Sequence, residues 1–213
     1  MPKVLVLFYS RTGNTARLAD AVADGARSVR FTEVDVRRLE DLAADDVVAA
    51  DEAWSEARER LRRGYRTLDD VEALADYDAI VLGSPTRYGG MAAELKYLLD
   101  RTGPLVAAGR LVDRVGSAFT TGQSPHGGHE TTLWSMMTPM ASLGMIIVPP
   151  GHTDPVMLAA GSPYGATAVT AEGGPTDADL AVARHQGARV ARVAEWVRHA
   201  KSHEAGHGHH HHH

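Results

Sequence analysis

The sequence contains no cysteine. This absence excludes disulfides, thiolate nucleophiles and zinc sites built from cysteine, so any redox chemistry must be carried by a cofactor or a metal. The sequence also lacks an uninterrupted apolar run of about 18 residues, the length that a helix needs to cross a bilayer. We therefore expect a soluble protein that does not insert into a membrane.

Positive charge is not in excess either, since the formal net charge is −5. This balance provides no basic surface for nucleic acid or anionic membranes, so small molecules are the expected partners. The amino terminus runs directly into an apolar stretch, without the basic segment and cleavage site of a secretory signal. The expected location is therefore cytoplasmic.

The chain is long for one minimal domain and short for two, and its 44% hydrophobic content is sufficient for one sizeable core. We predict one domain over residues 1–200, with a charged insertion at about 37–70 whose apolar spacing indicates an added or elongated helix. In the tail, residues 201–213, His207 and the run His209 to His213 resemble an affinity tag. A native metal-binding tail is the alternative, and no other metal site is expected.

Apolar runs alternate with helical patterns along the chain. The predicted strands cover residues 3–9, 31–36, 77–85, 115–121 and 145–149, and the predicted helices outside the insertion cover 15–26, 93–101, 130–143 and 177–200. This alternation predicts an α/β fold, a doubly wound parallel sheet with helices on both faces and right-handed crossovers. Ligands of such folds bind beyond the carboxyl ends of the strands, where the strand order reverses.

The loop after the first strand combines hydroxyls, an amide and a glycine directly before a helix. Its residues are Ser10, Arg11, Thr12, Gly13, Asn14 and Thr15. The free amides of the first helical turn and the helix dipole favour an anion, and Gly13 allows the backbone to approach it closely. The loop lacks the GxGxxG and GK[ST] patterns, so it predicts a mononucleotide phosphate site. A simple capped turn is the alternative.

Two further polar, glycine-containing loops follow later strands, at residues 83–90 and 120–128. Because the carboxyl ends of parallel strands share one edge, these loops should meet the first loop there. Their amides can bond the polar edge of a flavin ring while Pro85 and Tyr88 contact its faces. The alternative is that Arg87 and Tyr88 form an ordinary surface pair and Pro85 only ends a strand.

The sequence resembles the WrbA family of flavodoxin-like, FMN-dependent NAD(P)H:quinone oxidoreductases through VLVLFYSRTGNT, LADYDAIVLGSPTRYGGM, the 120–128 loop, GMIIVP and SPYGAT. The resemblance covers residues 1–197, and GSPTRYGGM together with SPYGAT is more specific to the family than the phosphate loop. It implies a flavodoxin-like five-stranded sheet of order 2-1-3-4-5. It also implies a homotetramer with sites near subunit contacts.

The resemblance further implies the cofactor and the reaction. NADH or NADPH would donate hydride to bound FMN, and a quinone would then be reduced by two electrons in ping-pong order. The implied FMN phosphate site is residues 10–15. The other implied cofactor-binding residues are Pro85, Thr86, Arg87, Tyr88, Gly89, Thr120, Thr121, Gly122, Gln123, His126 and Gly127.

The sequence departs from the family where some members carry aromatic or histidine rings. These positions are occupied here by Thr12, Val106, Ser142 and Leu143. The missing rings would stack on or hydrogen-bond the nicotinamide or quinone, so the departures concern the substrate rather than FMN. His126 is a candidate to replace them as a catalytic proton donor, and an exposed loop histidine is the alternative.

Two other functions are compatible with the same patterns. An electron carrier of the flavodoxin type would hold FMN and dock on protein partners, but flavodoxins are usually more acidic than a net charge of −5 implies. A regulatory or scaffold protein has no basic region or motif to support it. The sequence therefore favours the quinone oxidoreductase.

Overall fold

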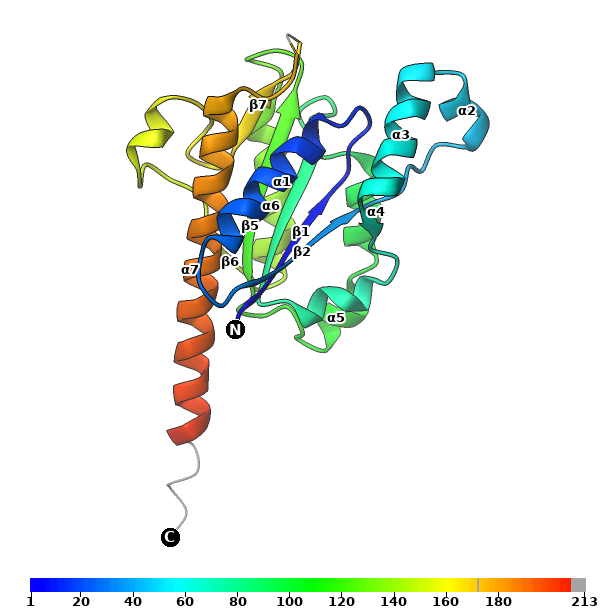
Figure 1. Cartoon of the computed structure of the whole chain (residues 1–213). Coiled ribbons are helices and arrows are strands. Elements are labelled where there is room, and N and C mark those ends of the chain that lie inside the picture. The colour runs from blue at the N-terminus through cyan, green and yellow to red at the C-terminus, as the bar shows by residue number, and fades with distance from the viewer. Residues whose placement is uncertain (172, 208–213) are drawn as a thin grey trace.

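The computed structural model describes residues 1–171 and 173–207, which form a parallel sheet between two layers of helices (Figure 1). The strands are β1 (Lys3–Phe8), β2 (Glu33–Arg38), β3 (Arg66–Thr67), β4 (Ala79–Pro85), β5 (Val115–Gly122), β6 (Ile146–Ile147) and β7 (Thr167–Val169). The α-helices are α1 (Asn14–Arg27), α2 (Asp45–Ala49), α3 (Glu52–Gly64), α4 (Ala93–Asp100), α5 (Gly103–Ala107), α6 (His129–Ser142) and α7 (Asp177–His207). Two short 3₁₀ helices, η1 (Val71–Asp76) and η2 (Pro155–Leu158), complete the described elements.

The strands lie in the order β3-β2-β1-β4-β5-β6, with β7 also paired to β5, and the pairings are parallel. The predicted strands correspond to β2, β1, β4, β5 and β6, so the predicted order 2-1-3-4-5 is confirmed. The added strands β3 and β7 have two and three residues, which is too short for a periodic pattern in the sequence. The strand order reverses between β1 and β4, so ligands are expected near their carboxyl ends.

The central strand β1 is buried on both faces. Val4, Val6 and Phe8 pack in one apolar cluster with α1 and α7. Leu5 and Leu7 pack in a second cluster with α4 and α6. This double burial explains the continuous apolar run KVLVLF. With both faces covered, the loops at the carboxyl edge are the part of the sheet that is open to ligands.

Helices α1 and α7 cross at a very short distance on one face of the sheet. A Cβ added at Gly25 of α1 would clash with the carbonyl oxygen of Arg184, and one added at Gly187 of α7 would clash with that of Val22. Both positions therefore require glycine for packing, although glycine costs a helix interior roughly 0.5–1 kcal/mol relative to alanine.

The last strand position is divided between β6 and β7, which pair with opposite ends of β5. The fully buried Gln186 of α7 bridges the gap between them. Its Nε2 donates to Ser117 Oγ and to Ala118 O, both at 2.7 Å. Its Oε1 accepts the Ala166 N–H at 2.8 Å. Both polar atoms of the Gln186 amide are thus hydrogen-bonded. The side chain can therefore be buried between β6 and β7 without leaving a polar group unsatisfied.

The structure differs from the sequence-based boundaries in the first third of the chain. The predicted strand at 31–36 was wrong at its start, because Phe31 has a φ of 60° and 65% of it is exposed. Strand β2 therefore begins two residues later, at Glu33. The charged insertion holds two helices rather than one, since Asp51 has extended backbone angles and caps α3 by accepting the Trp54 N–H.

Two findings concern the tail and the membrane. His207 is the last described residue and belongs to α7, whereas the run His209 to His213 lies outside the described residues. No helix in residues 1–171 or 173–207 combines the length and the hydropathy that crossing a bilayer requires.

Candidate functional site

A cavity of about 740 Å³ opens at the carboxyl edge of the sheet, between the loops after β1, β4 and β5 and the amino-terminal end of α3. Its lining residues are Arg11, Thr12, Asn14, Thr15, Asp51, Ala53, Trp54, Pro85, Thr86, Arg87, Tyr88, Thr121, Gly122, Gln123, Ser124, Gly127 and Thr170. The volume is that of a pocket for a ligand of cofactor size.

The amino-terminal end of α1 forms one side of this cavity. Gly13 occupies the N-cap position with a φ of 104°, a left-handed conformation that favours glycine. Among the described residues, no side chain caps the helix, although Thr15 and Ala16 in its first turn are buried. The hydroxyl of Ser10 instead accepts the Gly13 N–H at 3.0 Å and so fixes the loop. The first-turn amides are thus positioned for an anion.

The loop after β4 is a tight hairpin at the rim. Arg87 and Gly90 exchange backbone hydrogen bonds of 2.8 and 3.0 Å. Tyr88 and Gly89 are the two central residues of this turn, and their φ values are 54° and 82°, as in a type I′ turn. The side chain of Tyr88 is fully exposed. Positive φ is unfavourable for tyrosine, and such conformations concentrate at ligand sites.

The loop after β5 is fixed to both other loops. The hydroxyls of Thr121 and Thr15 hydrogen-bond at 2.9 Å in a buried contact. The Thr86 Oγ1 donates to the carbonyl of Gly127 at 3.4 Å, and Thr132 of α6 donates to Thr86 at 2.7 Å. The three loops that the sequence analysis singled out therefore form one connected unit.

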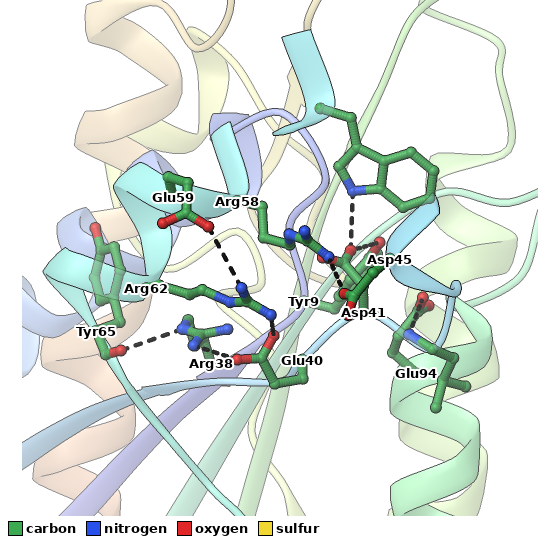
Figure 2. Close-up of polar contacts among 12 residues, drawn as sticks. Tyr9, Arg38, Glu40, Asp41, Asp45, Arg58, Glu59, Arg62, Tyr65 and Glu94 are labelled. Carbon is green, nitrogen blue, oxygen red and sulfur yellow. Dashed lines mark hydrogen bonds and ion pairs between the residues drawn. The ribbon is translucent and has the colours of Figure 1, made fainter. Parts of the chain in front are cut away.

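The fourth side of the cavity comes from the charged insertion. Arg11 lies over the ring of Trp54, with its guanidinium carbon 4.0 Å from the ring centroid. The same guanidinium pairs with Asp51 at 3.0 Å. The Trp54 indole donates to Asp41 at 3.0 Å, and Asp41 also accepts the Tyr9 hydroxyl at 2.7 Å (Figure 2). Helix α3 is thus linked to the loop after β1 by hydrogen bonds, an ion pair and a cation–π contact.

Two ionisable groups of this wall have shifted pKa values. The backbone N–H of Trp54 lowers the pKa of Asp51, and the Arg11 guanidinium lowers it further. Burial raises the pKa of Tyr9, and its hydrogen bond to Asp41 raises it further. At neutral pH, Asp51 is therefore an anion and Tyr9 a neutral donor.

A second polar cluster fixes α3 further along. Arg38 of β2 is buried and pairs with Glu40 at 2.6 Å, and Arg62 of α3 pairs with the same carboxylate at 3.4 Å (Figure 2). The hydrogen bond from Arg38 lowers the pKa of Glu40. Arg58 of α3 also pairs with Asp45 at 2.9 Å. These contacts hold the insertion against the sheet, so its cavity-facing residues have defined positions.

Most of the predicted cofactor-binding residues line the cavity, and the structure gives each of the others a place. The predicted residues outside its lining are Ser10, Gly13, Gly89, Thr120 and His126. Ser10 and Thr120 are buried and support the loops, the latter by donating to Ser84 O at 2.7 Å. Gly13 and Gly89 supply positive φ angles. His126 is exposed on the loop after β5, so its proposed proton role stays a prediction.

The cavity also contains residues that the sequence patterns missed. These are Asp51, Ala53, Trp54, Ser124 and Thr170. Ser124 lay within a predicted loop, and Thr170 follows the unpredicted strand β7 and donates its backbone N–H to Gly122 O at 2.8 Å. Of the positions at which family rings are missing, Thr12 lines the cavity, whereas the other three do not belong to its described lining.

Known proteins resemble this chain in sequence and in fold. A family profile described as NADPH-dependent FMN reductase matches residues 2–153. A curated protein of Chromohalobacter salexigens named NAD(P)H dehydrogenase (quinone) is 42% identical over 208 residues, covering 91% of this chain and 98% of that protein. A protein of the same name from Archaeoglobus fulgidus is 44% identical over 197 residues, covering 92% and 98%. The crystal structure of a flavodoxin, WrbA-like protein from Agrobacterium tumefaciens matches with a TM-score of 0.65 and 25% identity, covering 92% of this chain and 99% of that one.

Proposed function

The chain belongs to the NADPH-dependent FMN reductase family, and from this premise we propose that it is an FMN-dependent NAD(P)H:quinone oxidoreductase whose FMN binds in the cavity at the carboxyl edge of the sheet. The observation that carries the assignment of the site is the meeting of three polar loops around one uncapped helix end.

The end of α1 fits a phosphate group. A buried first helical turn without a capping side chain in the described structure leaves amide groups that an anionic ligand would satisfy. The space in front of Gly13 is open, since an added Cβ there would have no described atom within 4 Å. The loop at 10–15 contains hydroxyl and amide donors and no carboxylate. This donor set supports the assignment of the FMN phosphate to the loop.

The other two loops fit a planar ring system. Pro85, Thr86 and Tyr88 form one side of the cavity, and Thr121, Gly122 and Gln123 belong to the next loop. A Cβ added at Gly122 would lie 2.9 Å from Thr86 Cγ2, so the loops are already in close contact. Such rigid walls favour a flat ligand whose edge meets backbone groups.

The chemistry is divided between the cofactor and the protein. Bound FMN would supply hydride acceptance from NADH or NADPH and two-electron transfer to a quinone. The amides of α1 would hold the phosphate, the two later loops would orient the ring, and the wall of Arg11 and Trp54 would limit access of water from the side of α3. The protein therefore acts by binding and positioning.

The first experiment is anaerobic mixing of FMN-loaded protein with NADH or NADPH, followed by benzoquinone, while the absorbance of oxidised flavin is recorded. Rapid loss of this absorbance and its return on addition of quinone are expected. Comparison of the two donors gives the nucleotide preference. A flavin that stays oxidised with both donors would overturn the assignment and favour an electron carrier of the flavodoxin type.

The assembly that we propose is a homotetramer. The support on the surface is a pair of exposed aromatic residues, Trp134 of α6 and Tyr164, whose ring centroids lie 5.3 Å apart. Tyr164 lies in a turn closed by hydrogen bonds between Ser162 and Gly165, within the segment SPYGAT that is typical of the family. Exposed aromatic residues are enriched in surfaces that associate.

A further inference from the structure

Arg11 is a cation held at the wall of the cavity by residues of a different element. We propose that its guanidinium recognises the diphosphate of the nicotinamide dinucleotide donor, and thereby sets affinity for that substrate. This inference rests on the proposed function. It assigns to the charged insertion a role in substrate binding, since Trp54 and Asp51 of that segment determine where the guanidinium lies.

The guanidinium is fixed from two directions. Its carbon Cζ lies over the Trp54 ring, 4.0 Å from the ring centroid, and its Nη2 pairs with Asp51 at 3.0 Å. Asp51 is itself fixed, because its other oxygen accepts the Trp54 N–H at 3.0 Å. The Trp54 indole is held by Asp41. A cation whose rotamer is already restricted loses less entropy when it binds a ligand.

Part of the guanidinium is available to a ligand. Arginine has five N–H donors, and within the described residues the hydrogen bond to Asp51 uses Nη2. The Arg11 side chain lines the cavity, and its relative exposure to solvent is 41%. A diphosphate offers several anionic oxygens that match the planar fork of arginine.

The nicotinamide dinucleotide is the ligand that this charge fits best. The FMN phosphate is matched by the amides and hydroxyls at the end of α1, whereas the guanidinium of Arg11 is turned to the residues of α3. Quinones are neutral and gain little from a fixed cation. NADH and NADPH both carry a diphosphate, so a cation beside the FMN site would strengthen the binding of either donor.

Arg87 is the competing cation in the same cavity. It is exposed on the hairpin, and its guanidinium donates to the carbonyl of the neighbouring Thr86 at 3.2 Å. No described residue holds the Arg87 guanidinium as Trp54 holds that of Arg11, so Arg87 loses more side-chain entropy on binding a ligand. We therefore assign the larger contribution to Arg11.

The test compares two hydride donors that differ in the diphosphate. Steady-state kinetics of Arg11→Met would be measured with NADH and with reduced nicotinamide riboside, which has the same dihydronicotinamide ring and no diphosphate. We expect the KM for NADH to rise about tenfold relative to that for the riboside, as for the loss of one charge-assisted hydrogen bond. The KM for benzoquinone, measured separately, should change less than that for NADH.

Two further variants separate charge from structure. Arg11→Lys keeps the positive charge and should recover part of the affinity for NADH. The matched control is Arg101→Met, because the guanidinium carbon of Arg101, directly after α4, lies 4.9 Å from the ring centroid of Tyr97 in a similar pair, outside the cavity lining among the described residues. This control should not alter the ratio of the two KM values.

A binding measurement makes the result independent of turnover. Calorimetric titration of FMN-loaded protein with NAD⁺ should give an affinity about tenfold lower for Arg11→Met than for the wild type. This expectation does not depend on whether the wild-type protein reduces quinones. In the kinetic test, an equal rise of the KM values for NADH and for the riboside would overturn the proposal in favour of a structural role. A larger fall in FMN affinity than in NAD⁺ affinity, or an effect confined to Arg87→Met, would also overturn it.

Discussion

The hydroxyl pair of Thr15 and Thr121 joins two loops of the cavity through a single buried contact of 2.9 Å. Both residues also line the cavity, so their hydroxyls can be shared with a ligand. A hydroxyl in such a position has two functions, since it fixes the distance between α1 and the end of β5 and adds a polar group to the proposed phosphate site.

The variant Thr15→Ala should weaken FMN binding. Loss of one charge-assisted hydrogen bond costs roughly 1.5–3 kcal/mol, which corresponds to about a 10- to 150-fold loss of affinity. Fluorescence titration of the apoprotein with FMN measures the change. Thr15→Ser retains the hydroxyl and serves as the control. Equal affinities for the alanine variant and the wild type would contradict the assignment of the phosphate to this loop.

Single residues of the site were predictable where their chemistry is local. The place of the loop at 10–15 beside the cavity could be predicted, because a glycine and polar residues between a buried strand and a helix favour a ligand site at that edge, whereas the anion itself stays a prediction. Trp54 could not, since its apolar spacing in α3 is equally typical of a core position. Its place in the cavity depends on the hydrogen bond to Asp41, thirteen residues away, which no local pattern encodes.

At the scale of elements, the crossing of α1 and α7 depends on two glycines. We predict that Gly187→Ala destabilises the fold by about 1–3 kcal/mol, since the added methyl group would force the helices apart. Thermal unfolding followed by circular dichroism should show a midpoint several degrees lower. The control is Gly64→Ala at the end of α3, where an added Cβ has no described atom within 4 Å. A midpoint unchanged by Gly187→Ala would show that this contact can relax.

The long, buried elements could be predicted from the sequence, and the short or exposed ones could not. Strands β1, β4 and β5 have six to eight residues and nearly complete burial, so their apolar runs are unambiguous. The boundary of α2 and α3 depends on one capping residue, Asp51, in a segment of dense charge. Strand β7 is defined by its pairing with β5, a distant part of the chain, and Gln186 of α7 accepts the N–H of Ala166 directly before it.

At the scale of the whole molecule, the family matches confirm the resemblance that the motifs indicated. They do not supply the assembly, which stays a prediction. Light scattering combined with size exclusion should give a mass about four times the 22.8 kDa of one chain. Trp134→Arg should lower this mass if the exposed aromatic pair lies in a subunit contact. A wild-type mass of one chain at micromolar concentration would exclude the tetramer.

The shortness of the outermost strands protects the molecule from aggregation. Strand β3 at one edge has two residues, and β6 and β7 at the other have two and three. Because β3 covers only the end of β2, the outer edge of β2 stays open over residues 33–36, a short stretch in which Glu33 and Asp35 carry charges that oppose the addition of a foreign strand. Copies of this protein should accordingly associate through side chains, and the native sheet itself should not act as a template for fibrils.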